Sequence, residues 1–167
     1  MVGDLCRYKR VWTRAIQLQP RRRKKCYGYT PTCQKKMNLS RISKSVKRGA
    51  ECVDDVLVVF TCSRKSEGRL ICGIYKKAKI YAKLIDSTKN EREIKEKENK
   101  KYYAKYNIIC NAEDAILINR DKRVKRLPRS SRKNGVLGHG QSSIWYVDKP
   151  ERQNLKNDLL DYVESII

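Results

Sequence analysis

Residues 53–62, with the sequence VDDVLVVFTC, constrain the fold more than any other part of this chain. A run of β-branched and aromatic side chains of this kind is typical of a strand buried in the centre of a sheet. Residues 64–69 contain Gly68 and predict a hairpin turn. Residues 70–75 and 78–84 follow as two strands, or as one long bent strand, and the pairing is expected to be antiparallel.

Further strands are predicted on both sides of this hairpin. Residues 106–110 and 116–119 read as strands separated by a turn over residues 111–115, and residues 143–147 read as a last strand. Residues 5–19 are expected to form either a first strand or a short helix. Residues 26–33 (CYGYTPTC) contain glycine and proline and indicate a loop or a short strand.

Helices are expected at the edges of this strand-rich centre. Residues 38–49 predict a short helix capped at Asn38 or Ser40. Residues 86–105 are nearly all charged, with Glu and Lys at helical spacing, and favour an exposed helix or a mobile loop inserted in the domain. The last segment, residues 154–167, predicts an amphipathic helix. Its apolar face holds Leu155, Leu159, Tyr162, Val163 and Ile166.

These elements predict an α+β fold, a small and mostly antiparallel β-barrel with flanking helices and a C-terminal amphipathic helix. A length of 167 residues is typical of one domain spanning 1–167. No stretch approaches the apolar length of a transmembrane helix, and the first residues lack the apolar region of a signal peptide. A cytoplasmic protein without membrane association is therefore expected.

The charge of the chain indicates its partner. Lys and Arg number 40 against 18 Asp and Glu, giving a net charge of +22, which repels itself unless an anion offsets it. Nucleic acid is the favoured partner on charge, and a ribosomal or generic RNA role fits the charge equally well. An acidic membrane surface is the second candidate, but no basic helix with a broad apolar face is evident.

Basic residues cluster at residues 21–25 and in a basic loop over residues 120–140. We expect them to contact phosphates, with a solvated charge run as the alternative. The predicted phosphate-binding residues are Arg21, Arg22, Arg23, Lys76, Lys77, Lys79, Arg123, Lys125, Arg126, Arg129, Arg132 and Lys133.

Residues 138–146 (GHGQSSIWY) have the composition of a pocket for a nucleic-acid base. Glycines allow a close backbone approach, Gln141 and Ser142 can hydrogen-bond a base edge, and Trp145 offers a face for stacking. Trp145 and Tyr146 point to opposite faces of a strand, so at most one of them lines a given pocket. Core packing of the aromatic ring and bracing of the loop by the polar side chains are the alternatives.

Several pieces of the chain, taken in order, resemble a known family. They are Tyr27-Gly-Tyr29, Asn38-Leu39 with Arg41-Ile42, VDDVLVVFTCS, CGIYKKAKIY, YNIICNAEDAILI, RLPR and GHGQSSIWY. The set resembles a domain found beside HNH nuclease or other effector domains in bacterial restriction-type proteins, in which three pieces read approximately GWYKNATVY, AEDAVLL and GFGQSNVWY. That domain is similar to the PUA-like superfamily, which includes the EVE, YTH and ASCH modules. The resemblance covers roughly residues 25–165.

The resemblance implies a reader of modified or flipped bases in DNA, or of RNA, with an aromatic pocket on a small barrel. Extruding a base costs a few kcal/mol, which stacking and edge hydrogen bonds offset. This chain departs from the family pattern where Ile74 and His139 replace aromatic residues and where Lys77 and Lys79 replace Asn and Thr. These changes favour phosphate contacts over base selectivity.

The base-pocket residues expected from this reading are Trp12, Tyr75, Tyr81, Asp114, Gln141, Ser142 and Trp145. Tyr75 and Tyr81 are six residues apart and face the same way in an unbroken strand, so they are expected to form one wall of the pocket or to pack on the sheet. Asp114 either accepts a hydrogen bond from a base amine or belongs to a helical turn. For Trp12, core packing is the alternative.

Neither a metal, nor a cofactor, nor catalysis is expected. The seven cysteines include no CxxC pair and are expected to be buried thiols, with a metal site at Cys26 and Cys33 as the alternative. His139 is the only histidine, and no common nuclease or hydrolase motif occurs. We therefore expect a non-catalytic DNA-binding module, the specificity part of a restriction or defence system whose nuclease or helicase effector lies elsewhere. An RNA-binding protein and a small metal-dependent nuclease are the alternatives.

Overall fold

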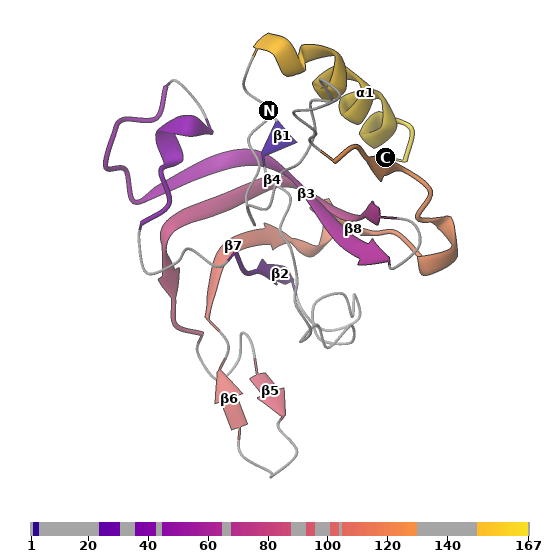
Figure 1. The fold of residues 1–167 in the computed structure, drawn as a ribbon. Coiled ribbons are helices and arrows are strands. Elements are labelled where there is room, and N and C mark those ends of the chain that lie inside the picture. Colours follow the sequence, from indigo (N-terminus) through magenta and orange to yellow (C-terminus); the bar gives the residue numbers. More distant parts are fainter. Residues whose placement is uncertain are drawn as a thin grey trace.

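A long antiparallel hairpin forms the centre of the molecule, as the sequence predicts. The computed structural model describes residues 2–3, 24–30, 36–42, 45–64, 68–87, 93–95, 101–103, 105–129 and 150–166. Strand β3 (Cys52–Arg64) pairs with β4 (Gly68–Ile85), and the two appear as long curved ribbons in Figure 1. The neighbouring residues Val58 and Val59 point to opposite faces of β3 and are both fully buried. The prediction of a central strand covered on both faces is therefore confirmed.

Strand β4 is long enough to pair along its second edge with a succession of short strands. These are β9 (Arg126–Leu127), β8 (Ala115–Leu117) and β7 (Tyr106–Asn111), all antiparallel to it. β2 (Lys25–Gly28) adds to β7, and β1 (Val2–Gly3) pairs parallel with β3, which gives the order β1-β3-β4-β7-β2. Within the described residues β1 and β2 do not pair with each other, so the sheet is open. The fold is α+β and mostly antiparallel.

Two facing β-bulges change the direction of side chains in the middle of the hairpin. Tyr75 lies opposite Val58 and Ala78 opposite Val56, so β4 holds one extra residue there, and Lys77 has a φ of 50°. The bulge on β3 lies just beyond, where Asp55 has a φ of 58°. Each extra residue reverses the alternation of side chains along its strand, because strand side chains alternate with a period of two.

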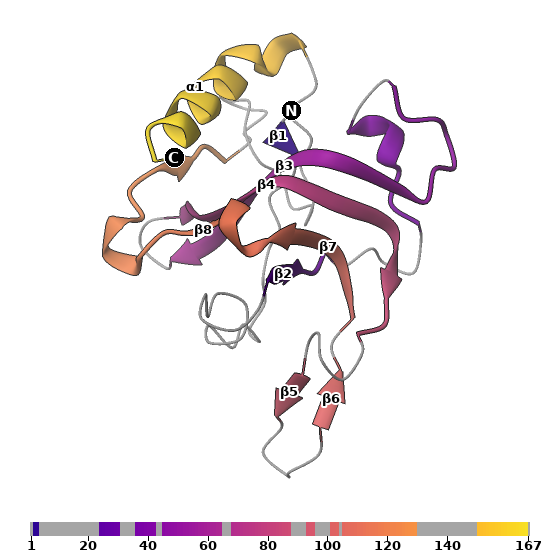
Figure 2. The same ribbon diagram turned by 180° about the vertical axis from the view of Figure 1, so that it is seen from behind.

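Two hydrophobic clusters hold the fold together, one on each face of the β3–β4 hairpin. The helix-side core lies under α1 (Gln153–Glu164), and the inner core lies under the 3-10 helix η1 (Leu39–Arg41). The helix-side core contains Val59, Ile71, Ile74, Ile118, Leu127, Leu159 and Val163. The inner core contains Cys26, Met37, Leu39, Ile42, Val56, Val58, Phe60, Tyr75, Ala78, Ile80, Ala82, Ile108 and Cys110. The predicted C-terminal amphipathic helix is confirmed, and Figure 2 shows α1 at one end of the sheet, away from β2 and β7.

The helix predicted over residues 38–49 is wrong except for its first turn. Asn38 caps that turn by accepting a hydrogen bond from the backbone N–H of Ser40 at 3.2 Å, as predicted. The helix ends after η1, and Gly49 takes a φ of 91°. Serine and β-branched residues lower helix propensity throughout this segment, so the nucleus formed at the cap has little to extend it.

The helix considered for residues 86–105 is also wrong, because the described parts of this segment form a two-stranded ribbon. β5 (Glu93–Lys95) pairs antiparallel with β6 (Lys101–Tyr103), and the ribbon projects from the sheet in Figures 1 and 2. Exposed i,i+4 ion pairs each contribute only about 0.2–0.5 kcal/mol, too little to fix a helix without an apolar face.

The described chain contains no helix with the length and apolar character needed to cross a membrane.

Candidate nucleic-acid interface

The basic segment of residues 120–129 runs from the 3-10 helix η3 (Arg120–Lys122) to β9 and is fixed from beneath. Arg123 Nε donates to the carbonyl oxygen of Ile118 at 2.8 Å. The Lys125 ammonium pairs with Asp158 of α1 and lies 5.8 Å from the ring centroid of Tyr162. Both cations are half-buried and join the segment to its support. Their observed role is therefore structural, whereas the sequence predicted phosphate contacts for both.

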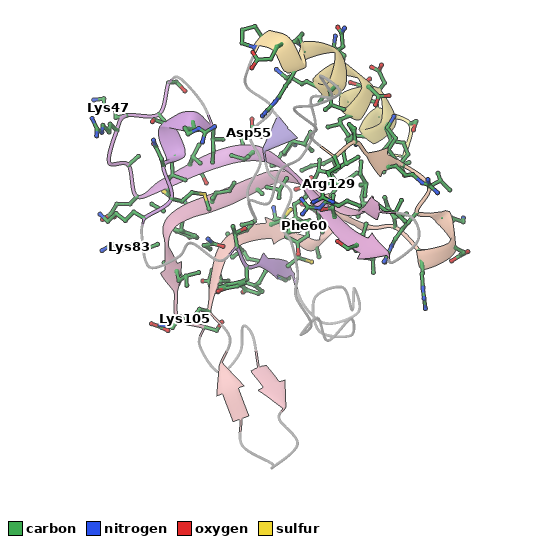
Figure 3. All side chains as sticks on the ribbon, viewed as in Figure 1. Lys47, Asp55, Phe60, Lys83, Lys105 and Arg129 are labelled. Atoms are coloured by element: carbon green, nitrogen blue, oxygen red, sulfur yellow. The ribbon has the colours of Figure 1, made fainter. Side chains whose placement is uncertain are left out.

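The neighbouring arginines point to solvent. Arg126 and Arg129 are exposed, and so are Arg120 and Lys122. Arg126 lies opposite Leu70 at the beginning of β4, and Figure 3 labels Arg129. Within β9 the exposed Arg126 is followed by the buried Leu127, as expected for side chains that alternate between the two faces of a strand. The structure thus presents these four cations on one short anchored segment.

The predicted phosphate contacts on β4 lie at the bulge. Lys77 is exposed, while Lys76 is half-buried and its carbonyl accepts a hydrogen bond from the Cys110 thiol at 3.0 Å. The Lys79 ammonium pairs with the Asp54 carboxylate at 3.2 Å, and the hydrogen bond to Asp54 is the main cause that raises the pKa of Lys79. Lys77 is therefore the most accessible of the three, and Lys79 already has an anionic partner.

The expectation that Tyr75 and Tyr81 share a face is wrong. Tyr75 belongs to the inner core and is 4% exposed. Its ring lies edge-on to Phe60 at 4.7 Å, and its hydroxyl donates to the carbonyl oxygen of Tyr27 at 3.4 Å. The bulge at Lys77 lies between the two tyrosines, and Tyr81 alternates with the core residues Ile80 and Ala82. In this structure Tyr75 packs in the sheet and presents no face for stacking.

Tyr81 instead belongs to a row of tyrosines that sequence reasoning missed. Its ring centroid lies 6.4 Å from that of Tyr106, which lies 4.8 Å from that of Tyr27, both at steep interplanar angles. These residues come from β4, β7 and β2, which are adjacent in the sheet. Tyr27 belongs to the YGY motif of the sequence, but only the strand order places its ring beside that of Tyr106. We call Tyr27, Tyr106 and Tyr81 the tyrosine row.

Two further positions of the family pattern, Asp114 and Ile74, do not lie beside Tyr81. Asp114 ends the 3-10 helix η2 (Ala112–Asp114) between β7 and β8, so the expected helical turn is present. Its charge acts on Cys110, in the inner core. Ile74, which stands where the family has tryptophan, is fully buried in the helix-side core, on the opposite face of β4 from Tyr75. The described candidates Tyr75, Tyr81 and Asp114 do not form one pocket.

Several predicted residues lie outside the described residues, and their placement stays a prediction. For the base pocket these are Trp12, Gln141, Ser142 and Trp145. For phosphate binding they are Arg21, Arg22, Arg23, Arg132 and Lys133. His139, Cys33 and the strand predicted over residues 143–147 also lie there.

No disulfide bond links the described cysteines, and Cys26 and Cys110 are buried opposite each other on β2 and β7. Burial, together with the smaller effect of the Asp114 charge, raises the pKa of the Cys110 thiol to about 12. Among the described residues, no three His, Cys, Asp or Glu side chains lie close enough to hold a metal ion.

The buried Cys110 thiol makes stability depend on alkaline pH. In the unfolded chain the thiol loses its proton near pH 9.0, whereas the folded chain keeps it to about pH 12. The unfolded state then binds fewer protons, so this contribution is intact below pH 9 and is lost as pH rises toward 12. We expect Cys110→Ala to reduce the decline of the unfolding free energy by up to about 1.4 kcal/mol per pH unit in that window. Urea titrations across the window measure it; Cys52→Ala is the control, and an unchanged decline in Cys110→Ala contradicts the prediction.

No protein-family model, no curated protein and no solved structure matches this chain.

Proposed function

We propose that this protein binds nucleic acid and that Arg126 and Arg129, with Arg120 and Lys122 beside them, contact its phosphates. The anchored basic segment is the observation that carries this proposal. Arg123 and Lys125 hold it against the domain, so the exposed cations lose less conformational freedom on binding than cations of an unattached loop. The net charge of +22 supplies the long-range attraction for a polyanion.

We further propose, from the resemblance to PUA-like modules, that the protein recognises a modified or flipped base in DNA and serves as the specificity part of a restriction or defence system. A nuclease or helicase on another domain or chain would supply the effector activity. The mostly antiparallel α+β fold supports this reading, whereas the described sheet does not close into the barrel that the resemblance implies. RNA binding by the same fold is the second candidate, because the exposed cations contact either backbone equally well.

Charge reversal at the anchored segment tests the phosphate contacts. We expect Arg126→Glu with Arg129→Glu to weaken duplex binding at least tenfold at about 50 mM salt, and to lower the slope of log K against log salt by about two. Lys47→Glu with Arg48→Glu is the matched control, since both side chains are exposed and Lys47 lies away from Arg129 in Figure 3. An equal loss in both double variants would mean that net charge, and not this segment, governs binding.

The choice of polymer is tested on the unmodified protein. Dissociation constants for DNA and RNA, as duplexes and single strands of one length, are measured at two salt concentrations. A preference that persists at the higher salt supports selective recognition, because the phosphate contribution weakens there. Equal affinity for every polymer at both salts would contradict base recognition and leave a general polyanion binder.

A further inference from the structure

The two outer members of the tyrosine row, Tyr27 and Tyr81, lie on the face of the sheet opposite the inner core. Lys79, Ile109 and Tyr27 are register partners across β4, β7 and β2. They alternate with Ile80, Ile108 and Gly28, and the first two of these belong to the inner core. The side chains of Lys79, Ile109 and Tyr27 therefore point to the face opposite the inner core. At the far end of β4 α1 covers that face, but Figures 1 and 2 show α1 away from β7 and β2.

This face combines half-buried aromatic rings with an apolar centre. Tyr27, Tyr81 and Ile109 are each half-buried, and Tyr106 is buried between the two outer tyrosines. The rings meet edge to face, which leaves parts of the outer rings facing solvent. Such a surface offers aromatic rings, held on a sheet, against which a flat apolar group can pack.

Cations surround this face. The Lys79 ammonium lies 5.8 Å from the ring centroid of Tyr81 while it pairs with Asp54. Lys105 lies at the edge and pairs with Asp86 at 3.0 Å. The exposed lysines on the same strands or beside them are Lys25, Lys77, Lys83 and Lys105. The surroundings therefore favour an anionic ligand that carries flat apolar groups.

We propose that Tyr27 and Tyr81 stack the bases of unpaired nucleotides while the surrounding lysines contact the backbone, so that this face binds single-stranded nucleic acid. The inference rests on the proposed function and names its substrate class. Unpaired bases expose their faces, whereas the bases of a duplex already stack on one another. Stacking on aromatic side chains also tolerates any base, so this face adds affinity without sequence preference.

Leucine substitutions separate this face from the anchored basic segment. We expect Tyr81→Leu and Tyr27→Leu each to weaken oligo(dT) and oligo(U) binding about tenfold and to change the affinity for a duplex of the same length less than about twofold. Tyr27→Phe, which keeps the ring, is the matched control and is expected to bind all of them as the wild type does. Tyr81→Phe keeps the ring and is expected to retain single-strand affinity.

Photocrosslinking of the native protein gives a measurement independent of variant folding. An oligonucleotide with 5-iodouracil is expected to crosslink to the peptides that hold Tyr27 and Tyr81, and not to the one that holds Tyr162. Wild-type binding with neither crosslinks nor selective loss in the leucine variants overturns this inference and leaves the anchored segment intact. If the wild type binds no nucleic acid at all, the proposed function fails as well.

Discussion

Replacing Asn107 by leucine is expected to lower the free energy of unfolding by about 3 kcal/mol. The Asn107 side chain is fully buried and pairs with both backbone groups of Thr30. Its Oδ1 accepts from the Thr30 N–H at 2.9 Å, and its Nδ2 donates to the Thr30 carbonyl at 3.1 Å. Leucine has a similar volume but no polar atoms, so two buried backbone groups lose their partners. Chemical denaturation measures the change.

Asn111→Leu is the control for this substitution. Asn111 ends the same strand, β7, and is exposed, so the same change there should alter stability by less than about 0.5 kcal/mol. If the two variants are equally stable, the Asn107 amide does not hold the segment after β2 in place. Because that segment follows Tyr27, we also expect Asn107→Leu to weaken oligo(dT) binding.

Replacing Ile74 by alanine is expected to destabilise the fold by about 3–4 kcal/mol. Ile74 is fully buried in the helix-side core with Leu159 and Val163 of α1. The loss combines the transfer free energy of the removed methyl and methylene groups with that of the cavity they leave. Denaturation followed by circular dichroism measures the loss.

Ile74→Val provides a graded comparison, since it removes one methylene group and should cost about 1 kcal/mol. The pair also tests where position 74 points. A large alanine effect places this side chain in the core, where an aromatic residue would pack against the helix and not against a base. An alanine effect as small as the valine effect would contradict full burial.

Much of the sheet was predictable because its signals are local. Each of its signals lies within one short segment of the sequence. They are the β-branched run of β3, the glycine-containing turn and the amphipathic period of α1. The predictions failed where weak local preferences decide little: η1 stops after one turn, and β5 and β6 form a ribbon in a segment whose charges suggested a helix. The charged segment has no apolar stripe that would hold a helix against the sheet.

The candidate site was less predictable because it depends on pairing between distant strands. The sequence by itself determined the composition of the candidate interface, namely the net positive charge, the basic segment after β8 and the tyrosines spread along the chain. Only the tertiary structure decided which of these side chains face solvent. The bulge at Lys77 leaves Tyr75 in the inner core and turns Tyr81 to the opposite face of β4, while the β4-β7-β2 order joins Tyr81 to Tyr27. The physical reason is that one extra residue in a strand reverses every later side chain, and strand register is set by packing across the whole sheet.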